Sequence, residues 1–575
     1  MTLRIPIGFD DFRRVREDKL EYIDKTDLIR QVIDRSGVQV LLLPRPRRFG
    51  KSMNLSMLRY WFEKNDESLA HLFQDLSIWS AGDEYRTHFQ KYPVIYFNFK
   101  ESKHAEFDAV MDVIKKKIES LFLRYEYLLH SDRLSEWQIR DFRSIIDRTA
   151  SIALYERALL DLSTYLHTHH GERVIILIDE YDEPIHAAHV HGFSAQMLQF
   201  MRSFLGAALK SNVHLFKSVI TGILRVAKEN LFSGLNNIAV YSLLDKEFNT
   251  CFGFTDDEVT SLLERANRID RLADTRAWYN GYLFGGEIIY NPWSILSYLE
   301  REDSIPKPYW VGTSSNELVH ELLGTYAIKV EHVFEELLEG RSIEAFLDEN
   351  VVLGELHTND AALWSLLVFS GYLKADPMPY DSVVGKVSYR LSIPNREVRE
   401  VYSSTFQRWI KSNLTAQGGD IGKLARAMLS GDTDTFEDQL QRFVQNILSY
   451  YDIAKLDPER VYHGFVLGLL AALEPEFIVR SNRESGAGRP DVMIRPRLAG
   501  KPGVLLELKL ARKGKKTPAA ALREGLAQIR SKGYAADLWA TGVSEVHAFA
   551  VAFDGKRVWI KSSEAGDKKK GKGKK

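Results

Sequence analysis

The chain has 575 residues, 45% of them hydrophobic and 27% charged, and a formal net charge of −1. These values are ordinary for a soluble globular protein of about three to four domains, and they give no overall attraction to nucleic acid, although such an average can hide local basic surfaces. The single cysteine, Cys251, excludes an intrachain disulfide framework and fits a reducing cytosol. No run reaches the roughly 18 to 20 apolar residues that span a bilayer, and the amino terminus lacks the apolar core of a signal peptide. We therefore expect a soluble, cytoplasmic protein with no membrane partner.

Residues 38–243 alternate short apolar runs with amphipathic stretches. The runs are rich in Val, Ile and Leu, and their sequences are VQVLLLP, PVIYFNF, RVIILIDE, HLFKSVITG and IAVYSLL. Runs of this kind, separated by helical segments, predict buried parallel strands of an α/β sheet. The long charged tract between the second and third runs, residues 101–170, predicts helices.

The first run leads into RPRRFGKS, a sequence close to the phosphate-binding loop of ATPases. The full pattern G-x-x-x-x-G-K-[ST] requires a glycine where this chain has Arg45. If the loop binds nucleotide, Gly50 lets the backbone approach the phosphates, Lys51 reaches the β- and γ-phosphates, and Ser52 ligates Mg²⁺. The alternative is a basic turn before a helix that happens to contain Gly-Lys-Ser.

Polar residues at the ends of two later runs favour the nucleotide interpretation. Asp179 and Glu180 end the third run, where Asp179 can hold Mg²⁺ through water and Glu180 can act as the general base that orients or polarises the attacking water. Thr221 and then Arg225 end the fourth run, near the expected γ-phosphate. Acids also cap ordinary strands, and an arginine there can lie on the surface. The order of strand, loop, helix and acidic strand nevertheless predicts a site for ATP and Mg²⁺.

Residues 244–425 are mostly helical in pattern. They include the aromatic stretch AWYNGYLFGGEIIYNPWSIL, to which we assign no catalytic role, and a candidate hairpin, KVSYRLSIP.

Several segments give residues 3–320 a specific resemblance to the bacterial AAA-ATPase-like family. They are IPIGFDDFRRVREDKLEYIDKTDLI, LLPRPRRFGKS, LIDEYDEPI, VITGILRV, FGFTDDEV, WYNGYLFGGEIIYNPWSIL and PYWVGTSSN. The resemblance implies that RPRRFGKS is the family's own form of the Walker A motif, so that Arg45 belongs to the loop and Arg47, Arg48 and Phe49 join the nucleotide-binding residues. It also implies a helical lid and a winged-helix-like region after the core, for which ALWSLLVFSGYLKA and KVSYRLSIPN are suitable segments.

Two acids and a lysine lie in RPDVMIRPRLAGKPGVLLELKLA. Asp491 begins one predicted strand, and Glu507 and Lys509 share one face of the next, because strand side chains alternate. If the two strands pair, both carboxylates converge and can hold Mg²⁺, which activates water and stabilises a phosphodiester transition state. Lys509 can position or deprotonate that water. Exposed strands often pair acid with base, but charges inside an apolar run are costly unless they have partners.

Neighbouring segments add candidates to this second site. Glu459 lies one helical turn before His463 and is either a third metal ligand or a capping or ion-paired glutamate. Glu484 and Arg489 contact substrate or form a loop ion pair, and Gln528 lies on a helix expected to cover the sheet. The lysine-rich tail and LARKGKK either contribute sequence-independent phosphate contacts or aid solubility.

The order of these features resembles the PD-(D/E)xK nuclease superfamily over residues 450–545. The resemblance implies Asp491, Glu507 and Lys509 as catalytic residues, Mg²⁺ as cofactor and nucleic acid, DNA rather than RNA, as partner. The expected organisation is a P-loop ATPase domain (1–243), a helical lid and winged-helix-like region (244–425), a nuclease-like domain (426–562) and a disordered tail (563–575).

We therefore expect an α/β protein that hydrolyses ATP and cleaves DNA with Mg²⁺, in DNA processing or in defence against foreign DNA, either alone or as a homo-oligomer. The alternative is an ATP-gated signalling or scaffold protein whose nuclease-like domain only binds nucleic acid or a protein partner.

Overall fold

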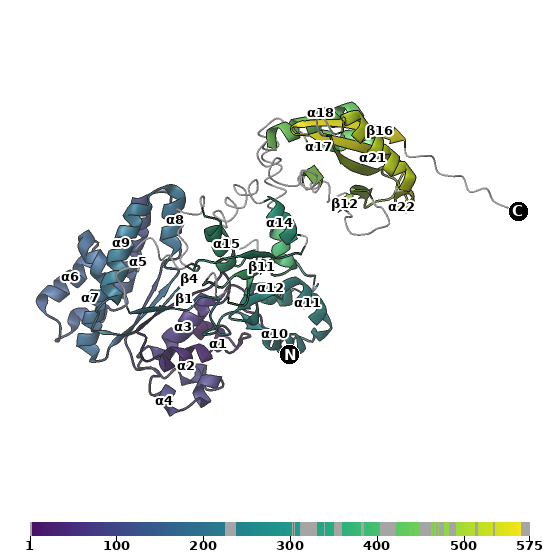
Figure 1. The fold of residues 1–575 in the computed structure, drawn as a ribbon. Coiled ribbons are helices and arrows are strands. Elements are labelled where there is room, and N and C mark those ends of the chain that lie inside the picture. The colour runs from purple at the N-terminus through teal and green to yellow at the C-terminus, as the bar shows by residue number, and fades with distance from the viewer. Residues whose placement is uncertain are drawn as a thin grey trace. The chain divides into compact units, whose positions relative to one another are not determined.

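A computed structural model shows two compact units (Figure 1). The first comprises Met1–Leu318 and Glu339–Val401, and the second comprises Val319–Leu338 and Tyr402–Lys575. The structure describes residues 3–224, 237–301, 303, 305–310, 331–338, 340–349, 359–380, 385–402, 421–447, 462–463, 465–466, 470, 477–481, 490–511, 516–532 and 535–564. Within these residues, no helix has the length and hydrophobicity needed to cross a membrane.

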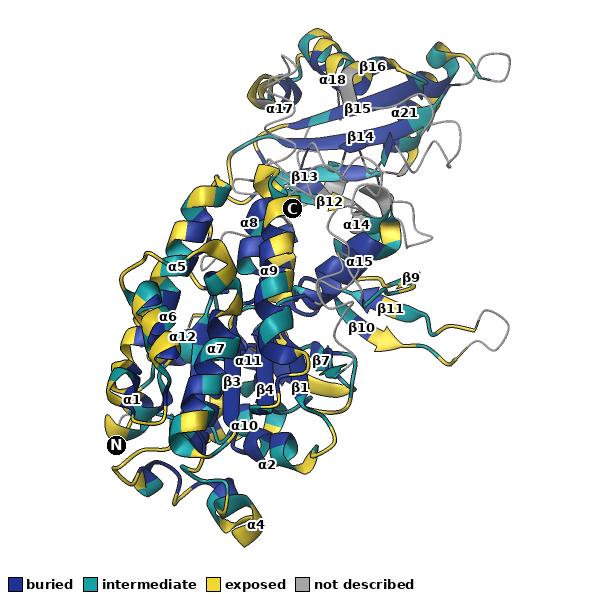
Figure 2. Cartoon of the chain, turned by 90° about the vertical axis from the view of Figure 1, so that its left-hand side faces the viewer, coloured by how far each residue is buried: buried dark blue, intermediate teal, exposed yellow. Residues whose placement is uncertain are grey.

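A five-stranded parallel sheet forms the centre of the first unit, with the strand order β2-β3-β4-β1-β5. Its strands are β1 (Val40–Pro44), β2 (Val94–Asn98), β3 (Val174–Asp179), β4 (Leu215–Gly222) and β5 (Ile238–Val240). These are the five apolar runs of the sequence, so the predicted parallel sheet is confirmed. The central strands β1, β3 and β4 are almost entirely buried (Figure 2). Because they are neighbours, their carboxyl ends meet at one edge of the sheet.

Helices cover both faces of this sheet (Figure 1). One face packs on α1 (Phe12–Glu17), α2 (Asp27–Asp34) and α3 (Lys51–Phe62) in a shared apolar core. The other face packs on α5 (Phe107–Leu123), α7 (Ile152–His170) and α9 (Ser194–Leu209). The remaining helices are α4 (Asp83–Arg86), α6 (Glu136–Ile146) and α8 (Glu183–His191). The charged tract of residues 101–170 thus forms helices, as its pattern predicts.

The rest of the first unit combines helices with two small antiparallel sheets. Its helices include α10 (Asp256–Arg265), α11 (Leu272–Tyr279), α12 (Pro292–Glu300) and α15 (Asp360–Phe369). One sheet contains β6 (Phe254–Thr255), β8 (Glu287–Tyr290) and β7 (Tyr282–Phe284). The other contains β10 (Lys374–Pro377), β11 (Tyr389–Ser392) and β9 (Ile343–Ala345).

Two local predictions in this region need correction. The aromatic stretch contains a hairpin, β7–β8, rather than only helix, because Gly285 and Gly286 both take positive φ values and turn the chain back on itself. The segment KVSYRLSIP supplies one strand, β11, rather than both strands of a hairpin. Its partner β10 precedes it in the chain and pairs with it antiparallel.

The second unit is built on a mixed sheet with the order β12-β13-β14-β15-β16. Its strands are β12 (Phe477–Ser481), β13 (Val492–Pro496), β14 (Gly503–Leu510), β15 (Val546–Asp554) and β16 (Arg557–Glu564). Among the described strands of this sheet, only β14 and β15 pair in parallel. Helices α17 (Ile421–Ser430) and α18 (Thr433–Ile447) pack on one face, and α21 (Pro518–Lys532) and α22 (Ala535–Trp539) on the other. Helix α14 (Glu331–Leu338) also belongs to this unit.

Candidate nucleotide and metal sites

Arg45, which replaces the usual glycine of the phosphate-binding loop, is a buried anchor. Its side chain is inaccessible to solvent. Its Nη1 donates to the carbonyls of Pro44 (2.7 Å) and Tyr241 (2.8 Å), and its Nη2 donates to the carbonyl of Phe248 (3.2 Å). Burial lowers the pKa of the guanidinium to about 10, so the group stays charged at neutral pH. Arg45 therefore ties the end of β1 to residues 241–248.

The loop delivers Lys51 and Ser52 at the start of α3. Gly50 has a φ of 83°, which suits glycine, and is the N-cap of this helix. The Lys51 ammonium is buried and donates to two carbonyls of the loop, those of Arg45 (3.0 Å) and Pro46 (2.9 Å). Burial lowers its pKa. An ammonium group beside the free backbone N–H groups of a helix N-terminus is an arrangement that attracts a phosphate.

Asp179 lies at the centre of the site and joins the loop to the sheet. The Ser52 hydroxyl donates to its Oδ2 at 2.6 Å, and the Thr221 hydroxyl donates to its Oδ1 at 2.6 Å. The carboxyl group is fully buried, and this burial raises its pKa. A desolvated carboxylate beside a serine hydroxyl is a donor set that fits Mg²⁺, because hard oxygen ligands are what that ion prefers. Residues predicted on three separate segments are thus brought together.

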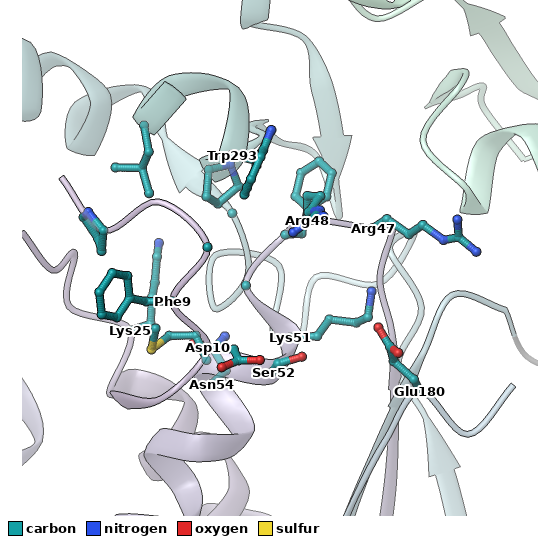
Figure 3. A pocket seen from close by; sticks show the side chains of 18 of the residues that line it. Phe9, Asp10, Lys25, Arg47, Arg48, Lys51, Ser52, Asn54, Glu180 and Trp293 are labelled. Atoms are coloured by element: carbon teal, nitrogen blue, oxygen red, sulfur yellow. The ribbon is translucent and has the colours of Figure 1, made fainter. Parts of the chain in front are cut away.

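Glu180 and Glu183 form an acidic pair, of which Glu180 lies beside Lys51. Figure 3 shows Glu180 close to the Lys51 side chain. Glu180 takes a positive φ of 52°, a conformation that is uncommon outside glycine and that sets the direction of its side chain. Burial and the adjoining Glu180 carboxyl raise the pKa of Glu183 to about 8. Both effects favour the protonated form of Glu183. Glu180, which directly follows Asp179 at the end of β3, is the candidate base.

A pocket of about 500 Å³ opens from the loop (Figure 3). Arg47, Arg48 and Phe49, which the family resemblance implies as nucleotide-binding residues, are among the residues that line it. Of these, Phe49 has a fully buried ring that packs on Tyr282 and Phe284, so its main part is to anchor the loop. Further lining residues come from distant segments of the chain, and no motif in the sequence connects them with the loop. These are mainly residues of the amino-terminal segment, two lysines after β2 and the start of α12: Pro6, Phe9, Asp10, Lys100, Lys103 and Trp293.

The second constellation assembles in the mixed sheet. Antiparallel pairing of β13 and β14 sets Val492 opposite Leu506, so Asp491 lies opposite Glu507 in the continued register. The Asp491 Oδ2 accepts the backbone N–H of Leu508 at 2.7 Å. The Lys509 ammonium donates to the Glu507 Oε1 at 2.8 Å, which confirms that these two side chains share a face. Helix α21 covers that face, as expected for the helix that carries Gln528.

The carboxyl group of Glu507 fits a cation. It is fully buried, and burial together with the Asp491 charge raises its pKa. Its Oε2 is buried and has no hydrogen-bond partner among the described residues. A buried carboxylate oxygen of this kind is costly unless it is bound. A divalent cation held between Asp491 and Glu507 would satisfy it and would supply the Lewis acid for attack on a phosphodiester.

Some predicted residues lie outside the described part of the chain: Arg225, Glu459, Glu484, Arg489 and the lysine tail. His463 is described, and its Nε2 lies 3.1 Å from the Asp491 carbonyl oxygen. Within the described residues, no group of three or more His, Cys, Asp or Glu side chains is arranged to hold a metal ion.

Comparison with known proteins finds similarity in two separate stretches of the chain. Residues 6–232 match the family described as predicted AAA-ATPase, and residues 457–563 match the PD-(D/E)XK nuclease superfamily. A protein of Azotobacter chroococcum mcd 1, described as "Uncharacterized protein in vnfD 5'region", is 26% identical over 562 residues, which cover 96% of each chain. The chain thus carries an AAA-ATPase-like domain followed by a PD-(D/E)XK nuclease superfamily domain.

Proposed function

We propose that this protein binds and hydrolyses ATP with Mg²⁺ through its first unit and cleaves DNA with Mg²⁺ through its second. The observation that carries the first half is the Asp179 network, in which Ser52 and Thr221 each donate to one carboxylate oxygen at 2.6 Å. Lys51 and the N-terminus of α3 bind the phosphates, and Ser52 and Asp179 hold the cation. Glu180 accepts the proton of the attacking water.

In the second half, Asp491 and Glu507 hold the cation, and Lys509 positions water or neutralises charge in the transition state. This assignment is supported by the register that sets Asp491 opposite Glu507, by the contact of Lys509 with Glu507 on β14, and by the Glu507 Oε2 that has no hydrogen-bond partner among the described residues. The biological setting, cytoplasmic DNA processing or defence against foreign DNA, rests on the combination of domains alone.

A cleavage assay tests the nuclease half. Wild type, Asp491→Ala and Lys509→Ala are incubated with single- and double-stranded DNA, with and without Mg²⁺. Each substitution should lower the rate by at least about 100-fold, because it removes a group that acts on the transition state. Glu545→Ala, in the same unit and with a side chain that is 71% exposed, is the matched control. Equal cleavage by all four proteins would contradict the assignment.

Nucleotide titration tests the ATPase half. Lys51→Ala should abolish ATP binding, since it removes the cation that the loop surrounds. If Lys51→Ala binds ATP as well as wild type, the loop is a basic turn rather than a nucleotide site.

A second candidate is an ATP-gated protein whose nuclease-like domain only binds its partner. One observation favours it: the Glu507 Oε1 is already paired with Lys509, and the Asp491 Oδ2 with the Leu508 N–H. Titration with Mg²⁺ or Mn²⁺ discriminates the two, because a domain that only binds has no metal affinity that depends on Asp491 and Glu507.

A further inference from the structure

Three segments that follow the parallel sheet in the chain contact the phosphate-binding loop, residues 45–52. The Arg47 carbonyl accepts the Asn291 side-chain N–H at 3.4 Å and the Trp310 indole N–H at 3.3 Å. The Arg48 guanidinium lies 4.3 Å from the centre of the Trp293 ring (Figure 3). On the third segment, Gly371 lies so close to Pro46 that an added Cβ would be 3.1 Å from the Pro46 Cβ.

One buried carboxyl group connects two of these contacts. The Glu397 Oε1 accepts the backbone N–H of Trp310 at 2.7 Å, and its Oε2 accepts the Ser294 hydroxyl at 2.7 Å. Ser294 directly follows Trp293 in α12, so Glu397 fixes both the residue that reaches the Arg47 carbonyl and the turn that carries the ring against Arg48.

The position of Glu397 is itself well determined. It belongs to residues 396–402, which are helical, and its side chain is fully buried. Asn395 caps this turn by accepting the Val398 N–H at 3.0 Å, and it donates to the Tyr279 carbonyl at 3.3 Å. A buried carboxyl group is costly, and burial raises its pKa to about 7. Its two contacts therefore hold a group that the interior would otherwise disfavour.

We propose that Glu397 is a positioning residue for nucleotide binding: by holding Trp310 and the start of α12, it fixes the Arg47 carbonyl and the Arg48 side chain of the phosphate-binding loop. The inference rests on the proposed nucleotide-binding function and extends it, because it makes residues near the end of the first unit part of the machinery that shapes the loop. Glu397 does not line the pocket and acts only through other residues.

The physical consequence is a loss of loop order when Glu397 is removed. The Trp310 N–H and the Ser294 hydroxyl would lose their buried acceptor, and the indole would no longer be held on the Arg47 carbonyl. The loop would then have to be ordered by the nucleotide at the moment of binding, which weakens affinity. Asp179 and Glu180, which act on the chemical step, lie at the end of β3, and Asp179 is held there by Ser52 and Thr221, so kcat should change little.

The test uses the full chain with Glu397→Ala, Glu397→Gln, Trp310→Phe and the double variant Glu397→Ala/Trp310→Phe, titrated with Mg·ATP and Mg·ADP. Glu397→Ala should weaken binding about tenfold, as expected for loss of a buried hydrogen-bonding network, while kcat stays within about twofold. Glu397→Gln should restore affinity to within about threefold of wild type, since its amide can accept from the Trp310 N–H and donate to Ser294. Trp310→Phe, which deletes the indole N–H but keeps an aromatic ring, should weaken binding as well. The double variant should lose less than the sum of the two effects, because the residues act on one contact.

The control is Asp161→Ala, which removes a partly buried, ion-paired carboxylate of α7 that lies outside this network. If wild type binds no nucleotide, the proposed function fails, and this inference fails with it. If wild type binds nucleotide, and Glu397→Ala and Trp310→Phe both bind it as tightly as wild type does, the inference alone is overturned. The inference is also overturned if Glu397→Gln binds nucleotide as weakly as Glu397→Ala does. The same holds if the loss of affinity in the double variant equals the sum of the losses in Glu397→Ala and Trp310→Phe. Should Glu397→Ala fail to fold, the affinity of Trp310→Phe decides.

Discussion

At the scale of single residues, an arginine in place of a loop glycine has a structural explanation. A glycine at this position would leave the carbonyls of Tyr241 and Phe248 without the donor that Arg45 now supplies. The charge is tolerated in the interior because the guanidinium also lies over the rings of Phe252 and Phe284, at 5.1 and 5.7 Å. The departure from the usual motif is thus a change in how the loop is anchored, and Gly50, Lys51 and Ser52 keep their places.

Replacing Arg45 by alanine should destabilise the first unit by about 3 kcal/mol, because it leaves buried carbonyls without donors and opens a cavity. Urea unfolding measures this free energy. The control is Arg140→Ala, whose side chain is 77% exposed and whose change should stay within about 0.5 kcal/mol. Equal stability of the two variants would show that the Arg45 contacts do not stabilise the fold.

Glu397 also predicts a pH dependence. Its pKa is raised from 4.5 to about 7, so the folded state binds a proton that the unfolded state has released between these values. The contribution of this raised pKa to the free energy of unfolding is complete at pH values below 4.5 and is lost as the pH rises through about 7. Relative to Glu397→Gln, the wild type should therefore become less stable between about pH 5 and about pH 8, as measured by urea unfolding at both values. A difference that does not vary with pH would contradict the raised pKa.

At the scale of secondary-structure elements, the face of β14 that carries Glu507 and Lys509 requires a close approach by α21. A Cβ added to Gly525 would lie 2.9 Å from the Ala550 Cβ and 3.6 Å from the Cγ atoms of Glu507 and Lys509. The missing side chain therefore lets the helix cover the acidic face of the sheet.

Gly525→Ala should cost about 1 to 3 kcal/mol by overpacking and should also lower DNA cleavage, since it pushes α21 away from the site. Gly206→Ala provides the matched control. Gly206 is also helical, but an added Cβ there meets no atom within 4 Å, so this substitution should stabilise the protein by about 0.4 to 1 kcal/mol. Thermal unfolding measures the change in stability of each variant. If both variants change stability in the same direction, close packing at Gly525 does not explain its role.

At the scale of the whole molecule, the two candidate sites belong to different compact units. Asp179 and Lys51 lie in the first unit, and Asp491 and Glu507 lie in the second. Each site takes all its described side chains from its own unit, so each should bind its ligand without the other.

The Lys51→Ala variant should therefore bind Mg²⁺ or Mn²⁺ at the nuclease site with an affinity within about twofold of wild type. The Asp491→Ala variant should bind ATP with an affinity within about twofold of wild type. Metal and nucleotide titrations by calorimetry measure both. Comparing DNA cleavage with ATP, with a non-hydrolysable analogue and without nucleotide then measures any coupling in catalysis. Loss of metal binding in Lys51→Ala would show that the sites depend on each other already at the level of binding.

The sequence by itself determined the five strands of the parallel sheet, the order of the motifs and the pairing of Glu507 with Lys509 on one face of a strand. Apolar runs are buried wherever the chain folds, and alternation alone places Glu507 and Lys509 on one face, so these predictions required no tertiary information. Only the tertiary structure decided what Arg45 does, that burial and Glu180 raise the pKa of Glu183, and that Glu397 is linked to the phosphate-binding loop. The reason is physical: hydrogen bonds, burial and pKa shifts depend on neighbours in space, and the partners of these residues, such as Phe248 for Arg45 and Trp310 for Glu397, lie far away in the chain.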